Sequence, residues 1–251
     1  MKEYSYVGIF AGTKLNFSFR HPETALYFRN FLAPSPMTKN AIRIPISDCD
    51  CWMQDYGMAD DGNTEFGMAV YRASDALLHE NRCVIHAAAF LWHERAYLLA
   101  ADSGVGKTTQ IKNWMALYNT ETQIINGDKP ILRKECDGTV TVHPSPWKGK
   151  EEWGDDTLSA PLGGIIILQQ GNKNTIQHLA PAYIVARLLS YCFSSFETSE
   201  SIHALCQMED AILRSTPVWR LVNKGDLAST RLIHDTLLRK EESDDGNTAA
   251  E

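Results

Sequence analysis

The stretch LLAADSGVGKTTQIKNW, from Leu98 to Trp114, constrains the fold more than any other part of the chain. An apolar run ends at a loop of small residues, and a lysine, two threonines and a helix-like sequence follow. A phosphate-binding loop needs glycines for the backbone wrap, a lysine for the outer phosphates and a hydroxyl for magnesium. Ala101 stands where the usual pattern has its first glycine, and a small residue meets the need for close packing there. The stretch therefore predicts a strand, a nucleotide-binding loop and a helix whose positive end faces the phosphate.

The predicted nucleotide contacts come from eight consecutive residues. Gly104 and Gly106 shape the wrap, Lys107 supplies positive charge and Thr108 supplies the magnesium-binding hydroxyl. The alternative, a chance glycine turn before an amphipathic helix, is disfavoured by the lysine and the two threonines. The full set is Asp102, Ser103, Gly104, Val105, Gly106, Lys107, Thr108 and Thr109.

Composition restricts the class of protein. The chain has 251 residues, 44% of them hydrophobic and 22% charged, which is typical of a soluble globular protein of one or two domains. A net charge of -7 argues against a nucleic-acid partner. The N-terminus is too polar for a signal peptide and no apolar run approaches the roughly 18 residues of a membrane span, so we expect a cytoplasmic protein without a membrane partner. The scattered cysteines are expected to be reduced thiols, mostly small buried residues: Cys49, Cys51, Cys83, Cys136, Cys192 and Cys206.

Alternating apolar residues and turn signals predict a strand-rich chain. The acidic segment DDGNTE, residues 60–65, is interpreted as a surface turn. The predicted strands are a hairpin turning at 11–13, a pair within 83–102 that turns at 93–95, a strand at 122–127, a hairpin within 130–143 that turns at 137–138, and strands at 163–171 and 218–223.

Apolar spacings of three and four predict the helices. One follows the phosphate loop directly, and the C-terminal third is mainly helical. The predicted helices cover residues 23–32, 65–80, 107–118, 181–193, 199–215 and 226–240.

Together these elements predict an α/β protein that leans towards α+β, with a mixed, partly antiparallel sheet around the phosphate loop. We expect residues 1–80 to form a small α+β portion, a candidate for substrate or partner recognition. We expect residues 81–240 to form the main domain around the phosphate loop, with a helical C-terminal portion, and the resemblance described below implies that it is the catalytic domain. The polar segment 241–251 is predicted to be disordered.

Three segments resemble the HPr kinase/phosphorylase family. VIHAAAFLWHERAYLLAADSGVGKTT is similar to the core of that family, in which a His-bearing strand leads through a hairpin into a DSGVGK-type loop. IINGDKPIL resembles the next strand, which ends in two adjacent acidic residues; here Gly127 stands first and Asp128 second. HPSPWKGKEEWG resembles a Pro-Trp-x-Gly-Lys segment of related bacterial proteins. The likeness covers residues 82–170, weakens to about 240, and does not extend to the N-terminal part.

The resemblance implies a P-loop core of the HPr kinase/phosphoenolpyruvate carboxykinase type that uses ATP and Mg²⁺. Lys107 would neutralise the β- and γ-phosphates, and Thr108 and Asp128 would hold Mg²⁺. Asp128 would also accept the proton of an attacking serine hydroxyl, and His86 would lie near the phosphate. An Asp at a strand end is otherwise a turn or cap residue, and a His among alanines is otherwise a hydrogen-bonded core residue.

The loop residues Lys148 and Lys150 flank a glycine, where two ammonium groups could clamp the phosphate oxygens during transfer. The alternative is a solvated loop with Trp147 packed beneath it. Arg187 lies on a mostly apolar helix and is expected to be an ion-pair partner rather than a catalytic group.

The favoured function is an ATP- and magnesium-dependent kinase that phosphorylates a hydroxyl, with serine first, on a peptide or small protein. Family relatives imply the peptide acceptor and a homo-oligomer. One alternative is a nucleotide-binding switch or scaffold without phosphotransfer, which the missing first acid favours. Another is a GTPase or ATPase, because the string NKGD at 223–226 follows a predicted strand and precedes a helix.

Overall fold

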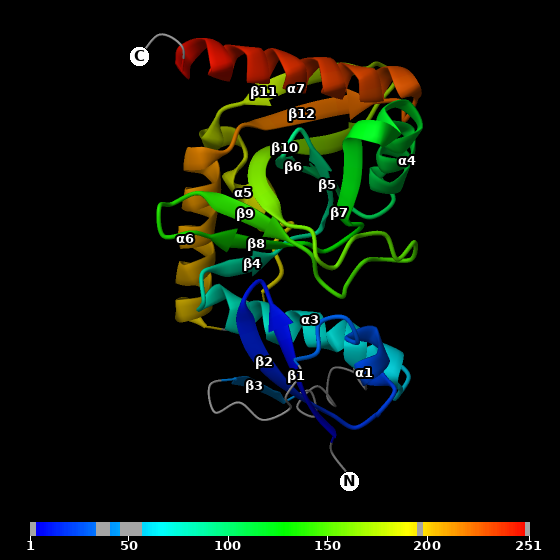
Figure 1. The fold of residues 1–251 in the computed structure, drawn as a ribbon, viewed down its shortest axis with the longest axis vertical. Helices are drawn as coiled ribbons and strands as arrows, with labels where there is room; N and C mark the ends of the chain where they lie inside the picture. Colours follow the sequence, from blue (N-terminus) through cyan, green and yellow to red (C-terminus); the bar gives the residue numbers. More distant parts are fainter. Residues whose placement is uncertain (1–3, 34–40, 46–56, 195–197, 249–251) are drawn as a thin grey trace.

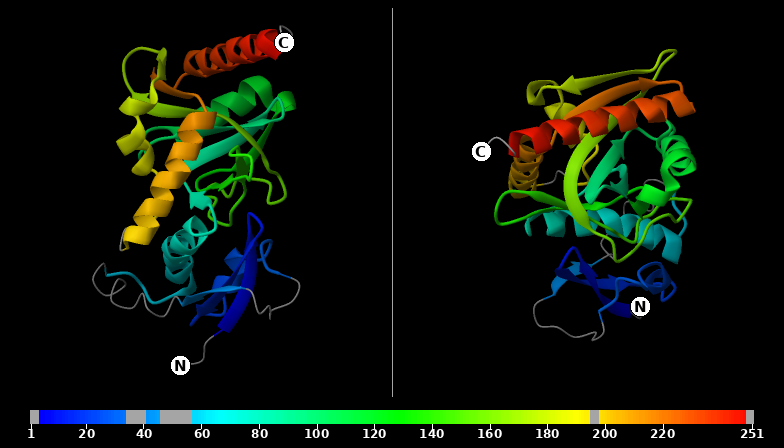
Figure 2. Two further views of the ribbon diagram at one scale, coloured as in Figure 1. Left: turned by 90° about the vertical axis from the view of Figure 1, so that its left-hand side faces the viewer. Right: turned by 45° about the horizontal axis from the view of Figure 1, so that its top comes forward.

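The structure is a computed structural model that describes residues 4–33, 41–45, 57–194 and 198–248. The N-terminal residues form a small unit, here called the N-terminal unit, that lies below the main sheet, with its long helix α3 on the side that faces the sheet (Figure 1; Figure 2). The N-terminal unit consists of β1 (Tyr4–Phe10), β2 (Thr13–Phe19), α1 (Thr24–Tyr27), β3 (Ile42–Pro45) and α3 (Gly62–Leu78).

The hairpin predicted at residues 11–13 is confirmed. β1 and β2 pair antiparallel, with Phe10 opposite Thr13, so two residues make the turn. Ala11 and Gly12 both have positive φ angles, 46° and 86°, as the favoured two-residue hairpin turn requires.

The surface turn predicted at residues 60–65 is wrong for residues 62–65, because α3 already begins at Gly62. The Asp61 side chain accepts a hydrogen bond from the backbone N–H of Thr64 at 2.8 Å, which caps the helix. The acidic residues that looked like a loop are therefore the start signal of the helix.

The main sheet has nine strands in the order β4-β8-β9-β10-β6-β5-β7, with β12 beside β10 and β11 beside β12. β10 pairs parallel with β6 and β12 and antiparallel with β9, so the predicted mixed α/β sheet is confirmed. The strands are β4 (Arg82–Val84), β5 (Ala87–Trp92), β6 (Arg95–Ala100), β7 (Thr122–Asn126), β8 (Ile131–Lys134), β9 (Val140–His143), β10 (Ala160–Gln170), β11 (Thr175–Leu179) and β12 (Val218–Asn223).

Both faces of this sheet are covered, because alternate residues of each strand point to opposite sides. Phe90, Leu99 and Ile166 pack with α4 (Lys107–Tyr118) and α7 (Leu227–Thr248). Their neighbours Ala89, Leu98, Ala100, Ile165 and Ile167 pack with residues of α5 (Val185–Leu189) and α6 (Ser199–Ser215). This double cover explains why the central strands read as continuous apolar runs.

A third hydrophobic cluster joins the N-terminal unit to the main sheet. It is rich in aromatic side chains, among them Phe10, Phe17 and Phe28, and it also contains Ile131 and Trp147 from the second half of the chain. The Trp147 ring stacks on Phe10 with ring centroids 5.9 Å apart. The two parts of the chain therefore share a core.

Most other predicted elements are confirmed, including the turn at 93–95 and the helix at 107–118. The strand predicted before that turn is divided at residues 85–86, because β4 pairs with β8 while β5 pairs with β6. The helix predicted at 23–32 is only α1, and that at 181–193 is a short 3-10 turn followed by α5. β11 was not predicted. α7 continues to Thr248, which corrects the predicted disorder for residues 241–248.

The four described cysteines are free thiols. Cys83 and Cys192 are buried as expected, whereas Cys136 and Cys206 are exposed. Cys49 and Cys51 lie outside the described residues. In the described ranges no helix combines the length and the apolar character needed to cross a bilayer.

Candidate phosphate-binding site

The predicted phosphate loop lies between the end of β6 and the start of α4. Gly104 and Gly106 have φ angles of 79° and 115°, a backbone region that favours glycine. A Cβ at either glycine would meet no atom within 4 Å, so space for a ligand is open above the loop. Gly106 immediately precedes the 12-residue helix α4, whose N-terminal N–H groups favour an anion.

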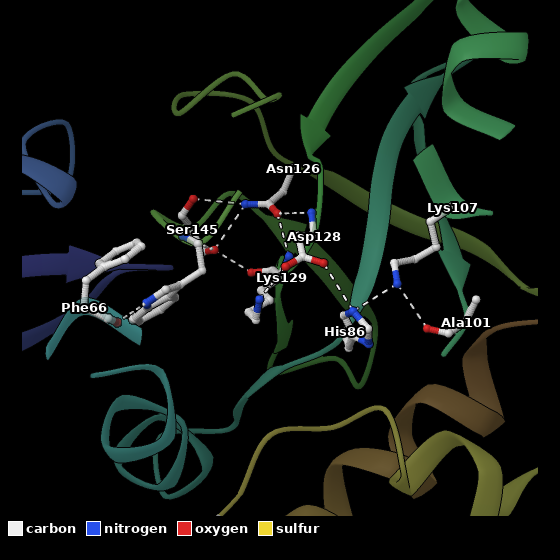
Figure 3. A network of polar contacts seen from close by, with 9 residues as sticks. Phe66, His86, Ala101, Lys107, Asn126, Asp128, Lys129 and Ser145 are labelled. Carbon is white, nitrogen blue, oxygen red and sulfur yellow. Dashed lines mark hydrogen bonds and ion pairs between the residues drawn. The ribbon is translucent and has the colours of Figure 1, made fainter. Parts of the chain in front are cut away.

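Lys107 is the first residue of α4. Its Nζ donates to the backbone oxygen of Ala101 at 3.1 Å and lies 3.0 Å from Nε2 of His86 (Figure 3). Burial lowers the pKa of Lys107, although Asp128 acts in the opposite direction. A bound phosphate would relieve this cost, because it supplies a full negative charge to the half-buried ammonium.

His86 connects Lys107 to Asp128. Its Nε2 lies 3.3 Å from Oδ1 of Asp128 as well as 3.0 Å from the lysine. One imidazole nitrogen either accepts from an ammonium or donates to a carboxylate, so the two contacts need different tautomers or charge states of the ring. The backbone fixes the ring's position, since His86 N–H donates to the Tyr191 oxygen at 2.7 Å and Ala87 N–H to the Asp128 oxygen at 2.9 Å.

Asp128 is a strongly acidic carboxyl group. Burial raises its pKa, but the hydrogen bond from His86 and the charge of Lys129 outweigh burial and hold the pKa at about 2. Lys129 Nζ contacts Oδ2 of the same carboxylate. Asp128 is therefore a fixed negative charge at neutral pH, and one residue, His86, links it to the lysine of the phosphate loop.

Asn126 positions Asp128, and the sequence analysis did not identify it. The side chain is fully buried; its Oδ1 accepts the backbone N–H groups of Asp128 at 2.9 Å and Lys129 at 2.8 Å. Its Nδ2 donates to the backbone and hydroxyl oxygens of Ser145, at 3.0 and 3.1 Å (Figure 3). An Asn before a Gly-Asp turn is a weak local signal, and Ser145 lies 19 residues away.

The segment 148–154, here called the site loop, packs against Gly127 and Asp128. A Cβ at Gly127 would lie 2.8 Å from the Lys148 carbonyl oxygen and 3.3 Å from that of Trp153. The Gly127 N–H donates to the Trp153 oxygen at 2.9 Å. A Cβ at Gly149 would lie 3.0 Å from the Asp128 Cβ. Packing of the site loop therefore requires a glycine at position 127.

The two predicted clamp lysines have different surroundings. Lys148 Nζ donates to the Gly154 oxygen at 3.0 Å and pairs with Asp156 Oδ1 at 2.7 Å. Lys150 is exposed. A phosphate contact from Lys148 requires that its ammonium leave Asp156, so the clamp stays a prediction for both lysines.

Arg187 forms the ion pair expected of it, and its partner belongs to the phosphate loop. Its Nη2 lies 2.7 Å from Oδ2 of Asp102, and its guanidinium lies 5.1 Å from the ring centre of Tyr191. The Asp102 hydrogen bond raises the pKa of Arg187. The pair balances a carboxylate that would otherwise face an anionic ligand.

The NKGD segment, residues 223–226, forms hydrogen bonds that stabilise the fold. Asn223 is buried; its Oδ1 accepts from Gln110 at 3.2 Å and from the Gly225 N–H at 2.8 Å, and its Nδ2 donates to Gln169. Asp226 accepts the Ser229 N–H at 2.9 Å, which caps α7. Asn223 and Asp226, the two side chains that would have to contact a guanine base, therefore already form hydrogen bonds within the protein.

The donor set fits a nucleotide with Mg²⁺. Mg²⁺ is typically held by one or two carboxylates, a hydroxyl and the phosphates of the nucleotide. The half-buried hydroxyl-bearing Thr108 follows Lys107 on the first turn of α4, and Asp128 is anionic. Within the described ranges no three His, Cys, Asp or Glu side chains gather as a metal-binding group, so the phosphates would have to supply most ligands.

No family model and no curated protein matches the chain. Among solved structures, the HPr(Ser) kinase/phosphatase from Coxiella burnetii is similar with a TM-score of 0.40 and 12% sequence identity, covering 67% of this chain and 98% of that chain. A likeness this distant supports no conclusion about the function of this chain. The function has to be inferred from the contacts of the site.

Proposed function

We propose that this protein is a phosphotransferase that binds ATP with Mg²⁺ and transfers the γ-phosphate to a hydroxyl, serine first, of a peptide or small protein. The observation that carries the proposal is the chain of contacts Lys107–His86–Asp128 beside an open phosphate loop. The Lys107 ammonium, which can bind a phosphate, and the negatively charged Asp128 carboxylate both contact the imidazole of His86. The acceptor class rests on the resemblance of the three sequence segments.

Each residue has a distinct role in the proposal. The backbone of residues 102–109 binds the phosphates, and Lys107 neutralises the outer ones. Thr108 and Asp128 would hold Mg²⁺, which supplies charge neutralisation between the phosphates. Transfer of a phosphoryl group depends mainly on positioning and charge stabilisation, so a single carboxylate suffices as metal ligand and as acceptor of a hydroxyl hydrogen bond.

We propose that His86 couples the position of the Lys107 ammonium to the orientation of the Asp128 carboxylate. When Lys107 turns to a phosphate, Nε2 of His86 no longer faces an ammonium and is free to donate to Asp128. The carboxylate is then oriented by His86 on one side and by Asn126 through the backbone on the other. Nucleotide binding and orientation of the carboxylate are coupled in this way.

The test measures binding and transfer separately. We expect a fluorescent ATP analogue to bind the wild-type protein, and Lys107→Ala to abolish binding. We expect Asp128→Asn to retain binding without magnesium but to lose transfer from labelled ATP to serine-containing peptides. Lys14→Ala, which removes an exposed lysine from β2 of the N-terminal unit, is the control. Binding that is unaffected by Lys107→Ala would refute the proposal.

A second candidate, a nucleotide-dependent switch without transfer, is favoured by the packing at Gly127, which leaves the site one carboxylate. Tight ATP binding with no transfer to any tested peptide would support it. Competition between ATP and GTP tests the GTPase alternative. We expect no preference for GTP, because Asn223 and Asp226 are engaged in the fold.

A further inference from the structure

A pocket of about 240 Å³ lies between the N-terminal unit and the main sheet, away from the phosphate loop. One wall is the hairpin turn with Ile9 and Gly12, and the opposite wall includes His143 and Asp156. The volume is below that of typical drug-sized sites, roughly 300–1,000 Å³. It suits one amino-acid side chain with part of its backbone.

Two arginines converge at the hairpin turn. Arg82 and Arg133 lie directly opposite each other on β4 and β8, an arrangement that is unfavourable for two like charges. Arg82 Nε donates to the Ala11 oxygen at 2.8 Å, and Arg133 Nη2 pairs with Glu135 at 3.0 Å. The remaining Nη2 of Arg82 and Nη1 of Arg133 each lie 3.5 Å from the point where a Cβ on Gly12 would sit.

Because residue 12 is glycine, it places no side chain between its backbone and the two guanidinium groups. A ligand oxygen cannot occupy the Cβ point itself, which is at bonding distance from the Gly12 Cα, but an oxygen that approaches Arg82 and Arg133 from outside the turn could accept a hydrogen bond from each. Burial and the neighbouring Arg133 lower the pKa of Arg82, as expected for two cations held together without a full counter-charge. Glu135 and Glu80 offset part of the charge, and His143 beside them is neutral because burial lowers its pKa to about 4.

The pocket is connected to the proposed acceptor site through the site loop. Asp156 on its wall pairs with Lys148 of the site loop, and that loop packs on Asp128 through Gly149. Arg133 is five residues beyond Asp128, so the two Cα atoms are at most about 18 Å apart. An extended peptide covers that distance in about five residues.

We propose that this pocket, with Arg82 and Arg133 at its edge, binds an acidic segment of a peptide: an apolar side chain against Ile9 and a nearby carboxylate between the two arginines. The assignment deepens the proposed function, because it specifies the acceptor as an acidic peptide with its anionic residue within about five residues of the phosphorylated hydroxyl. Charge complementarity supports a peptide carboxylate, since the arginine pair is a local positive feature on a chain of net charge -7.

The test uses the full chain without nucleotide, so that it does not depend on phosphotransfer. A fluorescein-labelled octapeptide with one Ser, one Leu and two Glu is titrated by fluorescence anisotropy, together with a twin in which Gln replaces both Glu. We expect Arg133→Gln to weaken binding of the Glu peptide by about ten-fold, and to leave the twin unchanged. Ser159→Trp, which fills the pocket from an exposed position on its wall, should weaken binding similarly.

The control is Arg239→Gln, which makes the same charge change on the exposed face of α7, at the far end of the molecule (Figure 1). Thermal unfolding of each variant confirms that it is folded. The proposal is overturned if the Glu and Gln peptides bind equally, or if Arg239→Gln weakens binding as much as Arg133→Gln. Binding of inorganic phosphate that is lost in Arg133→Gln, with no difference in binding between the Glu and Gln peptides, would assign the site to a free anion and refute the peptide. Acidic-peptide binding without any transfer would refute the proposed function and leave this inference standing.

Discussion

The guanidinium of Arg187 contacts the carboxylate of Asp102, with 2.7 Å between Nη2 and Oδ2, and so ties α5 to the phosphate loop. Both side chains are about half exposed, 47% and 58%, so the pair adds little to the stability of the fold. We expect the pair to affect the affinity for a phosphate ligand instead, because an unpaired Asp102 would repel a phosphate.

We therefore expect Arg187→Ala to weaken ATP binding by about five-fold, which corresponds to about 1 kcal/mol of repulsion near water. Asp102→Asn in the same protein should restore the affinity, because it removes the unpaired charge. Fluorescence titration with an ATP analogue measures both. Arg214→Ala, which breaks an exposed Arg–Asp pair on α6, should leave affinity unchanged. No rescue by Asp102→Asn would mean that Arg187 acts on the phosphate directly.

Asn126→Ala should cost about 2–4 kcal/mol of unfolding free energy, because it leaves buried partners on Asp128, Lys129 and Ser145 unsatisfied. Urea unfolding measures this loss. Asn113→Ala is the control, since Asn113 is half-buried and makes one described hydrogen bond, to the Gly225 oxygen. We expect its cost to be within about 1 kcal/mol, and an equal cost for the two variants would contradict the role given to Asn126.

His143 makes stability depend on pH. Its pKa is lowered from 6.5 to about 4 by burial and by Arg133, so the unfolded chain takes up a proton that the folded chain does not. The stabilisation is complete above pH 6.5 and falls as the pH drops to 4, by about 3 kcal/mol at most. Unfolding at several pH values should show this loss in the wild type relative to His143→Gln. Parallel curves for the two proteins would contradict it.

Glu209 acts with the opposite sign. Burial raises its pKa from 4.5 to about 7, and its Oε1 has no hydrogen-bond partner among the residues that the structure describes. The folded chain holds a proton that the unfolded chain releases, so stability falls as the pH rises from 4.5 to 7, again by about 3 kcal/mol at most. Glu209→Gln should remove this fall and be more stable than the wild type at pH 8. The wild-type profile between pH 4 and 7 should be flatter than that of either single variant, because the two effects oppose each other.

The parts of the site that the sequence predicts are those encoded locally. The turns at 11–13 and 93–95, the phosphate loop and the start of α4 at Lys107 depend on residues within a few positions of each other. Asp128 was identified through a resemblance to other proteins, and in the structure it is linked to Lys107 through two contacts of His86.

The residues that were missed or given other partners depend on contacts between distant segments. Asn126 gains its role only because Ser145 is folded against it. Lys148 pairs with Asp156, eight residues away, which no motif indicates. β11 is exposed along much of its length and, among the described strands, pairs with β12 alone, so it lacks the apolar alternation of a buried strand. Helix continuation through residues 241–248 was missed because their polar composition is typical of disorder.

Trp147, next to Lys148, is held by the N-terminal unit: its indole N–H donates to the Phe66 oxygen at 3.1 Å, and its ring is buried among Phe10, Phe28 and Phe66. The site loop can leave Asp128 freely only if that ring leaves its aromatic cluster. Backbone amides that the site loop protects, such as that of Gly127, should therefore exchange with deuterium no faster than the N-terminal unit opens, although they lie more than 100 residues beyond its first strand.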